Sequence, residues 1–234
     1  MKCLKLYAVA LLTVTGVSTF ALTANAEEGT GTNKQETSTA KLAVTGADEN
    51  SESEIIDEDL DDKDDENNNQ TGQKGPLTLD LVPNFNFGTE AIKAEGNVLA
   101  VNKEHKLAVQ VSDQRGTGAG WNLTLGLSDF VNLDQDASEK AAVLKGISLA
   151  TGIVSQKTTA NNPNKESAPE MPEITLIPGE DDVIYQAAAE AGLGTWLGYF
   201  AENNQAKTSL TIPAGNYVGE YAATLTWTLE NAPK

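Results

Sequence analysis

The residue types that carry most enzyme chemistry are scarce in this chain of 234 residues. It contains one histidine, His105, one cysteine, Cys3, and one arginine, Arg115. A Ser–His–acid arrangement would have to use His105, and thiol catalysis would have to use Cys3. The sequence has no Gly-x-Ser-x-Gly elbow and no HExxH pair, and the glycines of RGTGAG (115–120) precede a predicted strand instead of a helix. We therefore predict a protein that is not an enzyme and has no cofactor, with His105 at the surface.

Carboxylates offer the remaining route to chemistry. Twelve Asp or Glu residues and one Lys fall between Asp48 and Glu66. A calcium loop starting at Asp57 would need Gly at its sixth position and Glu at its twelfth, where the chain has Asp62 and Asn68. We predict no built metal site there, only weak association with cations. Sequence spacing does not exclude a catalytic carboxylate pair of the glycoside hydrolase kind, although such pairs usually lie among aromatic residues, which are few here.

Residues 27–76 as a whole are rich in Glu, Asp, Thr, Asn, Gln and Gly. Such a composition buries too little apolar surface to offset the conformational entropy of folding. We predict a disordered acidic linker over this range. The formal net charge of −18 also argues against nucleic acid as a partner, because phosphates would be repelled.

The N-terminus has the order of residues found in a secretory signal peptide. Lys2 and Lys5 precede an apolar stretch, which ends in the small-x-small site Ala24–Ala26. We predict cleavage after Ala26; the alternative is an uncleaved membrane anchor. Because Cys3 lies inside the signal, the mature chain would contain no disulfide and no thiolate metal site.

From Leu77 to Lys234 the chain alternates between short apolar runs and turn residues. Period-two alternation predicts strands over 77–82, 105–112, 121–128, 173–178, 208–213 and 221–229. The stretch VIYQAAAEA, preceded by Asp181 and Asp182 and followed by Gly192, predicts one short connecting helix. Many short strands in about 158 residues indicate an all-β fold, a β-sandwich or a Greek-key-like barrel.

Two of these strands carry a Trp-x-Leu tripeptide. In WNLTLGLS, Trp121 and Leu123 share one face, and Asn122 lies on the other. In YAATLTWTL, Trp227 and Leu229 likewise share a face. Alternation therefore predicts two core-facing tryptophans, each worth up to about 4–6 kcal/mol of burial.

The paired tripeptides, together with their surroundings, resemble the WxL-domain family of Gram-positive surface proteins. LDLVPNFNFGT (79–89), VSDQRGTGAGWNLTL (111–125) and GNYVGEYAATLTWTLENAP (215–233) are similar to the opening, first-motif and closing segments of that family. The resemblance implies a secreted, non-catalytic domain that attaches non-covalently to the cell wall, with peptidoglycan as its ligand. It also implies association with membrane-anchored WxL-interacting proteins and other WxL proteins.

Two tasks are compatible with this resemblance: direct wall binding, or service as a structural subunit that docks on a protein partner. We expect residues 77–234 to form the wall-binding domain and the two motif strands to lie close together. In our hypothesis the motifs support the binding surface, while their outward-facing neighbours contact the ligand. The candidate binding residues are Trp121, Asn122, Leu123, Thr226, Trp227, Thr228 and Leu229.

Overall fold

The structure is a computed structural model that describes residues 36–134, 136 and 138–232. The compact unit begins at Ala43, well before the predicted domain start at Leu77. The predicted signal peptide, residues 1–26, lies outside the described residues. Within the described part of the chain, no helix has the length and apolar character needed to cross a membrane.

The largest sheet has six antiparallel strands in the order β1-β2-β4-β11-β12, with β8 also paired to β11. Its central strands β4 and β11 are buried along almost their whole length. The strand bounds are β1 Asn68–Gln70, β2 Leu77–Pro83, β4 Leu107–Asp113, β8 Ser155–Thr158, β11 Gly194–Glu202 and β12 Gln205–Ala206.

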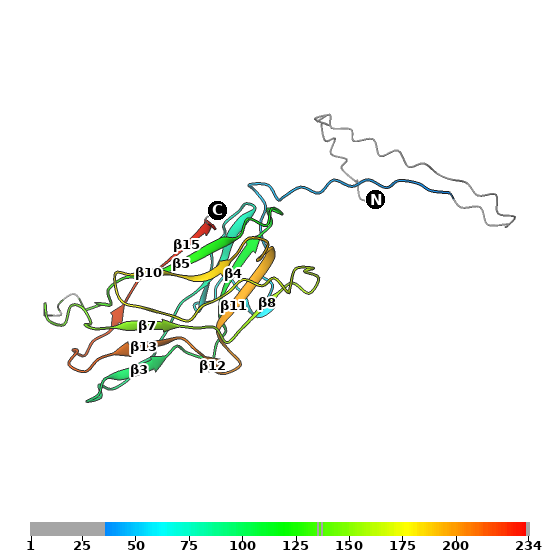
Figure 1. Ribbon diagram of the computed structural model, residues 1–234. Helices are drawn as coiled ribbons and strands as arrows, with labels where there is room; N and C mark the ends of the chain where they lie inside the picture. The colour runs from blue at the N-terminus through cyan, green and yellow to red at the C-terminus, as the bar shows by residue number, and fades with distance from the viewer. Residues whose placement is uncertain (1–35, 135, 137, 233–234) are drawn as a thin grey trace. The chain divides into compact units, whose positions relative to one another are not determined.

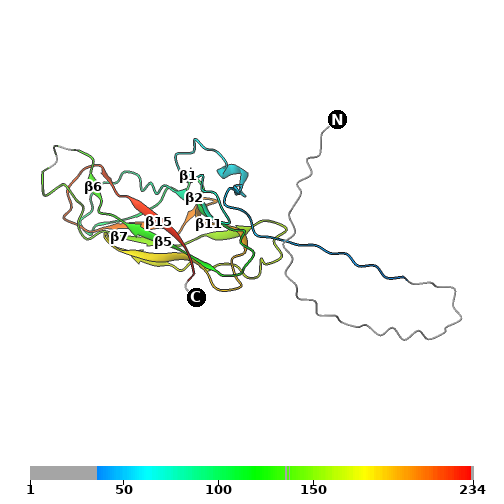
Figure 2. The same cartoon turned by 90° about the horizontal axis from the view of Figure 1, so that it is seen from above.

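A three-stranded sheet places β5 (Trp121–Leu127) between β10 (Asp181–Ala187) and β15 (Leu225–Asn231), as Figure 1 shows. A four-stranded sheet and a two-stranded one complete the domain, and Figure 2 gives the view from above. The four-stranded sheet has the order β3-β13-β7-β9, and β14 pairs with β6. Their bounds are β3 Asn97–Ala100, β6 Val131–Asn132, β7 Ser148–Thr151, β9 Ile174–Leu176, β13 Ser209–Ile212 and β14 Tyr221–Ala222.

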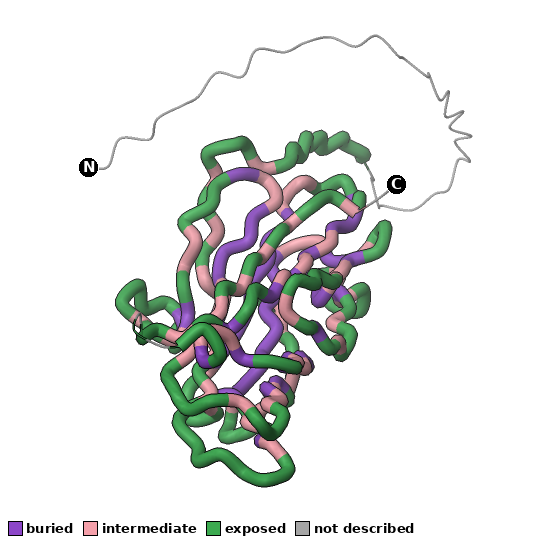
Figure 3. The backbone as a smooth tube through the Cα atoms, turned by 90° about the vertical axis from the view of Figure 1, so that its left-hand side faces the viewer, coloured by how far each residue is buried: buried purple, intermediate pink, exposed green. Residues whose placement is uncertain are grey.

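One large hydrophobic core joins these sheets. It contains Val109 and Val111 from β4 together with Leu123 and Leu125 from β5, and it extends to Leu149 and Leu210 of the four-stranded sheet. Buried backbone runs through the middle of the domain, and exposed backbone lies at its loops (Figure 3). The predicted all-β class is confirmed, and the paired strands of the described sheets are antiparallel.

The predicted connecting helix is wrong, because its first half is strand β10. Val183 pairs with Thr124 and Tyr185 with Leu123, and Ile184 and Tyr185 are buried in the core. The β-branched and aromatic residues gain more from pairing with β5 than the alanines would gain from a helix. The only helical turn in the described ranges is a 3-10 turn at Glu58–Leu60, in the acidic segment.

Disorder was expected throughout residues 27–76, and this does not hold for residues 48–76. Leu60 is 1% exposed and, with Ile55 and Ile56, packs on the outer face of the six-stranded sheet against Leu81 and Leu197. Three apolar residues thus sit within a stretch of twelve carboxylates, and the sheet supplies the apolar partners that the segment lacks by itself. Segment 48–76 is part of the domain, and both faces of β4 and β11 are consequently covered.

The Asp57 carboxylate fixes this segment to the sheet. Lys106 Nζ lies 2.9 Å and Lys157 Nζ lies 3.1 Å from its Oδ2, and the Tyr199 hydroxyl also donates to it. Burial raises the pKa of Asp57, but the hydrogen bonds from Lys106, Tyr199 and Lys157 outweigh this effect and hold that pKa well below its usual range.

Candidate functional site

The two Trp-x-Leu stretches lie on neighbouring antiparallel strands. Strand β15 pairs with β5 over its whole length, so that Leu229 lies opposite Leu123 and Trp227 lies opposite Leu125. The prediction that both motifs occupy one region of a β-domain is therefore confirmed. Since side chains alternate along a strand, Trp and Leu of both motifs share the inner face of this sheet.

Trp121 is fully buried at the start of the central strand. Its indole Nε1 donates to the carbonyl oxygen of Gly192 at 3.3 Å, and its ring stands edge-on to Tyr185 with centroids 4.9 Å apart. A Cβ at Gly192, which has a φ of +69°, would lie 2.9 Å from that same Nε1. The loop after β10 can therefore close over Trp121 only because this position is glycine.

Trp227 faces the core too, but it remains partly exposed, because β15 is an edge strand whereas β5 is central. Its ring lies 6.5 Å from that of Phe85 and 6.1 Å from that of Phe200, between centroids. Phe85 in turn stands edge-on to Phe200 at 5.2 Å. Trp227 thus belongs to an aromatic cluster that ties the motif sheet to the six-stranded sheet.

Arg115 holds the ends of the two motif strands together. Its guanidinium donates to Asp113 twice, from Nε at 2.8 Å and from Nη2 at 2.7 Å, and the Asp113 side chain is fully buried. It also donates to the carbonyl oxygen of Gly120, just before β5, and to the side-chain oxygen of Asn231, the last residue of β15. The planar, five-donor geometry of arginine suits this bridging role, and Arg115 is a positioning residue for both motifs.

The outward face of the same sheet forms a shallow groove of about 460 Å³, which we call the threonine groove. Register places Gly126 between Asp181 and Thr226, and Thr124 between Val183 and Thr228. The groove is lined by Thr124, Gly126, Leu127, Ser128, Gly179, Glu180, Asp181, Thr226, Thr228 and Glu230.

The structure separates the predicted binding residues into two groups. Thr226 and Thr228 line the threonine groove. Asn122 lies on the same face of the sheet, opposite Glu230 on β15, and Glu230 also lines the groove. Trp121, Leu123, Trp227 and Leu229 face the opposite side, toward the core.

Sequence reasoning did not single out Thr124, Gly126, Glu180 or Asp181, which also form this groove. Alternation along β5 was the available signal for Thr124 and Gly126, because it puts them on the outward face with Asn122. Glu180 and Asp181 belong to β10 and the turn before it, and the prediction of a helix there concealed them.

The chemistry of the threonine groove is that of hydroxyls and carboxylates. Three carboxylates line it, from Glu180, Asp181 and Glu230, and none of the described residues lining it is basic. In the described part of the chain, no cluster of His, Cys, Asp and Glu suitable for a metal ion occurs. His105 is exposed, as predicted, and lies in a loop before β4. The groove is equipped for hydrogen bonding to neutral or cationic groups and repels anions.

The described part of the chain is thus an all-β domain whose paired Trp-x-Leu strands support an open polar face. The family model for the WxL domain, described as surface cell wall-binding, matches residues 32–233. The chain therefore belongs to the WxL domain family and is associated with the cell wall at the cell surface. No curated protein and no solved structure matches the chain.

Proposed function

We propose that this domain is a non-catalytic module that binds peptidoglycan through the threonine groove. The observation that carries the proposal is the combination of hydroxyls, carboxylates and a flat glycine-centred floor on the face opposite the core motifs. Threonine hydroxyls donate to and accept from sugar hydroxyls and N-acetyl groups, and the carboxylates attract the amines of peptide stems. Anionic wall polymers, whose phosphates meet three carboxylates there, are disfavoured by the same charges.

The motifs serve this face indirectly. Trp121 and Trp227 anchor β5 and β15 to the core, and Arg115 fixes the ends of the two strands. Because a strand presents alternate residues to opposite faces, anchoring the inner side chains sets the spacing of Asn122, Thr226 and Thr228 on the outer face.

The test compares the wild-type protein with Thr226→Ala/Thr228→Ala in co-sedimentation with purified peptidoglycan, prepared with and without its anionic polymers. The matched control is Thr117→Ala/Thr175→Ala, which removes two exposed hydroxyls outside the groove. We expect the groove variant to lose most of its retention at an unchanged unfolding midpoint, and the control to retain both. Equal retention of the two variants would exclude this face as the binding site.

Docking on a protein partner is the second candidate function. A second, apolar groove lies at the other end of β15. Leu133, which lines it, is 55% exposed, and Val218, next to the lining residue Gly219, is 79% exposed. Exposed apolar surface of this kind is typical of protein–protein interaction sites. A pull-down with a membrane-anchored WxL-interacting protein or another WxL protein, in the absence of wall material, separates this function from direct wall binding.

We also propose that residues 1–26 direct export and that cleavage occurs between Ala26 and Glu27. Sequencing the N-terminus of the surface-extracted protein tests this. A sequence that begins at Met1 would show that the segment is retained.

A further inference from the structure

The segment Ser38–Thr45 has the properties of a β-strand without a sheet. Its alternation places Ala40, Leu42 and Val44 on one side. Every residue from Glu36 to Gly46 is exposed, and Leu42 and Val44 are 88% and 85% exposed, more than any other large apolar residue in the described part of the chain. The family match begins at residue 32, so this segment belongs to the matched domain although its apolar side is left uncovered.

The folded unit offers a sheet edge of the matching kind. In the described residues β14 pairs only with β6, and β15 pairs only with β5. Glu220 and Thr224 accept backbone hydrogen bonds from Leu133 and Ser128, which lie on the β6–β5 side. Since backbone groups alternate in direction along a strand, those of Tyr221, Ala223 and Leu225 point to the opposite, unpaired edge.

An apolar groove of about 860 Å³ runs beside this edge. We call it the apolar groove; its lining includes Phe85, Phe87, Leu99, Ile212, Tyr221 and Leu225. The side chains on one wall thus belong to the same residues whose backbone groups are unpaired. A strand added at this edge would place every second side chain in the apolar groove, which is the geometry of recognition by strand addition.

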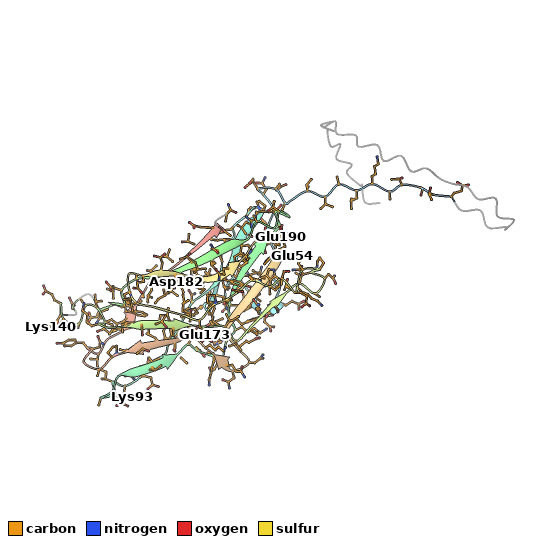
Figure 4. All side chains as sticks on the ribbon, viewed as in Figure 1. Glu54, Lys93, Lys140, Glu173, Asp182 and Glu190 are labelled. Atoms are coloured by element: carbon orange, nitrogen blue, oxygen red, sulfur yellow. The ribbon has the colours of Figure 1, made fainter. Side chains whose placement is uncertain are left out.

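Charge favours the same match. The chain carries a net charge of −18, yet residues 37–47 contain one lysine, Lys41, and no carboxylate. The charged residues that line the apolar groove are Glu90 and Glu220, and the described lining contains no basic residue. Lys93 and Lys140 lie at the end of the domain distant from Glu54 and Glu190 (Figure 4), and neither lysine lines the apolar groove.

We propose that residues 38–45 of one copy of this chain add as a strand to the β14–β15 edge of a second copy. Leu42 and Val44 then enter the apolar groove of that copy, and Lys41 lies on the outer side of the added strand, the side to which alternation along β14 also turns Glu220. Because the donor segment and the acceptor groove are different surfaces, the contact is heterologous. Each copy can donate to one neighbour and accept from another, which produces rows of copies unless two copies exchange segments reciprocally.

The first experiment measures association of the full chain, produced in a secreting host with Cys3→Ser, by sedimentation velocity over a range of concentrations. Leu42→Asp/Val44→Asp removes the apolar side chains, and the matched control Thr39→Asp/Thr45→Asp adds the same charge on the other side of the segment. We expect the wild type to associate and the first variant to weaken association at least tenfold, with a much smaller effect for the control. A wild type that stays monomeric at every soluble concentration, or equal weakening by both variants, overturns the proposal.

The second experiment identifies which copy supplies the strand. One protein carries Ala40→Cys and another carries Ala223→Cys, both with Cys3→Ser. Mixing them under oxidising conditions should produce a disulfide between the two chains, and Leu42→Asp/Val44→Asp in the donor should abolish it. A third protein carries both Ala40→Cys and Ala223→Cys. If a disulfide forms only within this protein and not between the two single-cysteine proteins, the segment occupies the groove of its own molecule and the proposal of a second copy is wrong. Both experiments omit wall material, so their outcome is independent of peptidoglycan binding.

Discussion

Leu123 of the first motif and Leu229 of the second are direct cross-strand partners on β5 and β15. Directly opposed side chains on one face of a sheet have their Cβ atoms about 4.5–5.5 Å apart and stabilise the pairing. The two tripeptides, separated by about a hundred residues, are therefore one local structure. Their inner side chains bind the sheet to the core, and their outer neighbours share the threonine groove.

The first prediction concerns the unequal burial of the two tryptophans. Trp121→Ala should lower the free energy of unfolding by about 3–5 kcal/mol, because it empties a fully buried site and leaves Tyr185 without its edge-on partner. Trp227→Ala should cost less, about 1–3 kcal/mol, because this side chain is only partly buried on an edge strand. Urea unfolding midpoints of the two variants measure the difference.

Peptidoglycan retention of the same variants distinguishes tryptophans that support the binding face from tryptophans that contact the ligand directly. If Trp227→Ala keeps the wild-type midpoint and still abolishes retention, Trp227 contacts the ligand directly. Loss of retention in proportion to lost stability is the result that a supporting role predicts.

The second prediction tests Arg115 as the bridge between the strand ends. Arg115→Lys keeps the charge but cannot donate in parallel to Asp113 while reaching Gly120 and Asn231. We expect a loss of about 1–3 kcal/mol in unfolding free energy, since the buried Asp113 loses hydrogen bonds. Lys103→Arg, at an exposed loop position, is the control and should have no measurable effect; an equally silent Arg115→Lys would contradict the bridging role.

Alternation of apolar residues was sufficient to predict β2, β4, β5, β9 and β13, and it predicted β14 and β15 as one strand over 221–229. It did not predict β11, because this strand is buried on both faces from Thr195 to Ala201 and its sequence does not alternate between apolar and polar residues. A continuous apolar run between Gly194 and the Asn203–Asn204 turn was the available signal for such a central strand.

Tertiary contacts account for the other differences. The Ala-rich stretch after Asp182 becomes a strand because β5 offers an edge, and the acidic segment is ordered because Lys106 and Lys157 converge on Asp57. The threonine groove likewise depends on the register between three strands that are distant in sequence. Side-chain alternation predicts which residues face outward, but not which of them become neighbours.

The third prediction is a dependence of stability on pH that arises from Asp57. Its pKa in the folded protein lies below that of an unfolded aspartate, about 3.9, so the folded state binds fewer protons at this site. The stabilisation by Asp57 is complete above the unfolded pKa of about 3.9 and is lost as the pH falls from that value toward the lower pKa of the folded protein. Asp57→Asn should remove about 1–3 kcal/mol at neutral pH and progressively less below about pH 4.

The measurement is the difference in unfolding free energy between wild type and Asp57→Asn at each pH. Taking this difference cancels the contributions that other carboxylates make to the pH dependence of stability. One of them is Asp80, whose pKa is raised by burial and whose contribution has the opposite sign. A difference that stays constant from neutral to strongly acidic pH would show that Asp57 does not fix the acidic segment to the sheet.

The last prediction uses Gly126, which lies at the centre of the threonine groove between Asp181 and Thr226. A Cβ built there would lie 3.6 Å from the Cβ of Asp181 and 3.7 Å from that of Thr226, which is ordinary van der Waals contact. Its backbone φ is not positive, so a side chain introduces no backbone strain. Gly126→Ala should therefore fold normally, and Gly126→Val should fold with unchanged or slightly higher stability, by up to about 1 kcal/mol, because a β-branched residue replaces glycine in a central strand.

Both variants fill the floor of the groove without touching the core, so peptidoglycan retention should fall in the order wild type, Gly126→Ala, Gly126→Val. Co-sedimentation measures retention, and thermal or urea unfolding confirms that the fold is intact. Gly120→Ala is the contrasting variant, since a Cβ there would lie 2.3 Å from the carbonyl oxygen of Ala187 and should destabilise the protein outright. Full retention by a correctly folded Gly126→Val protein would mean that the ligand binds elsewhere, because an occupied groove floor leaves a sugar ring no close approach to Thr226 and Thr228.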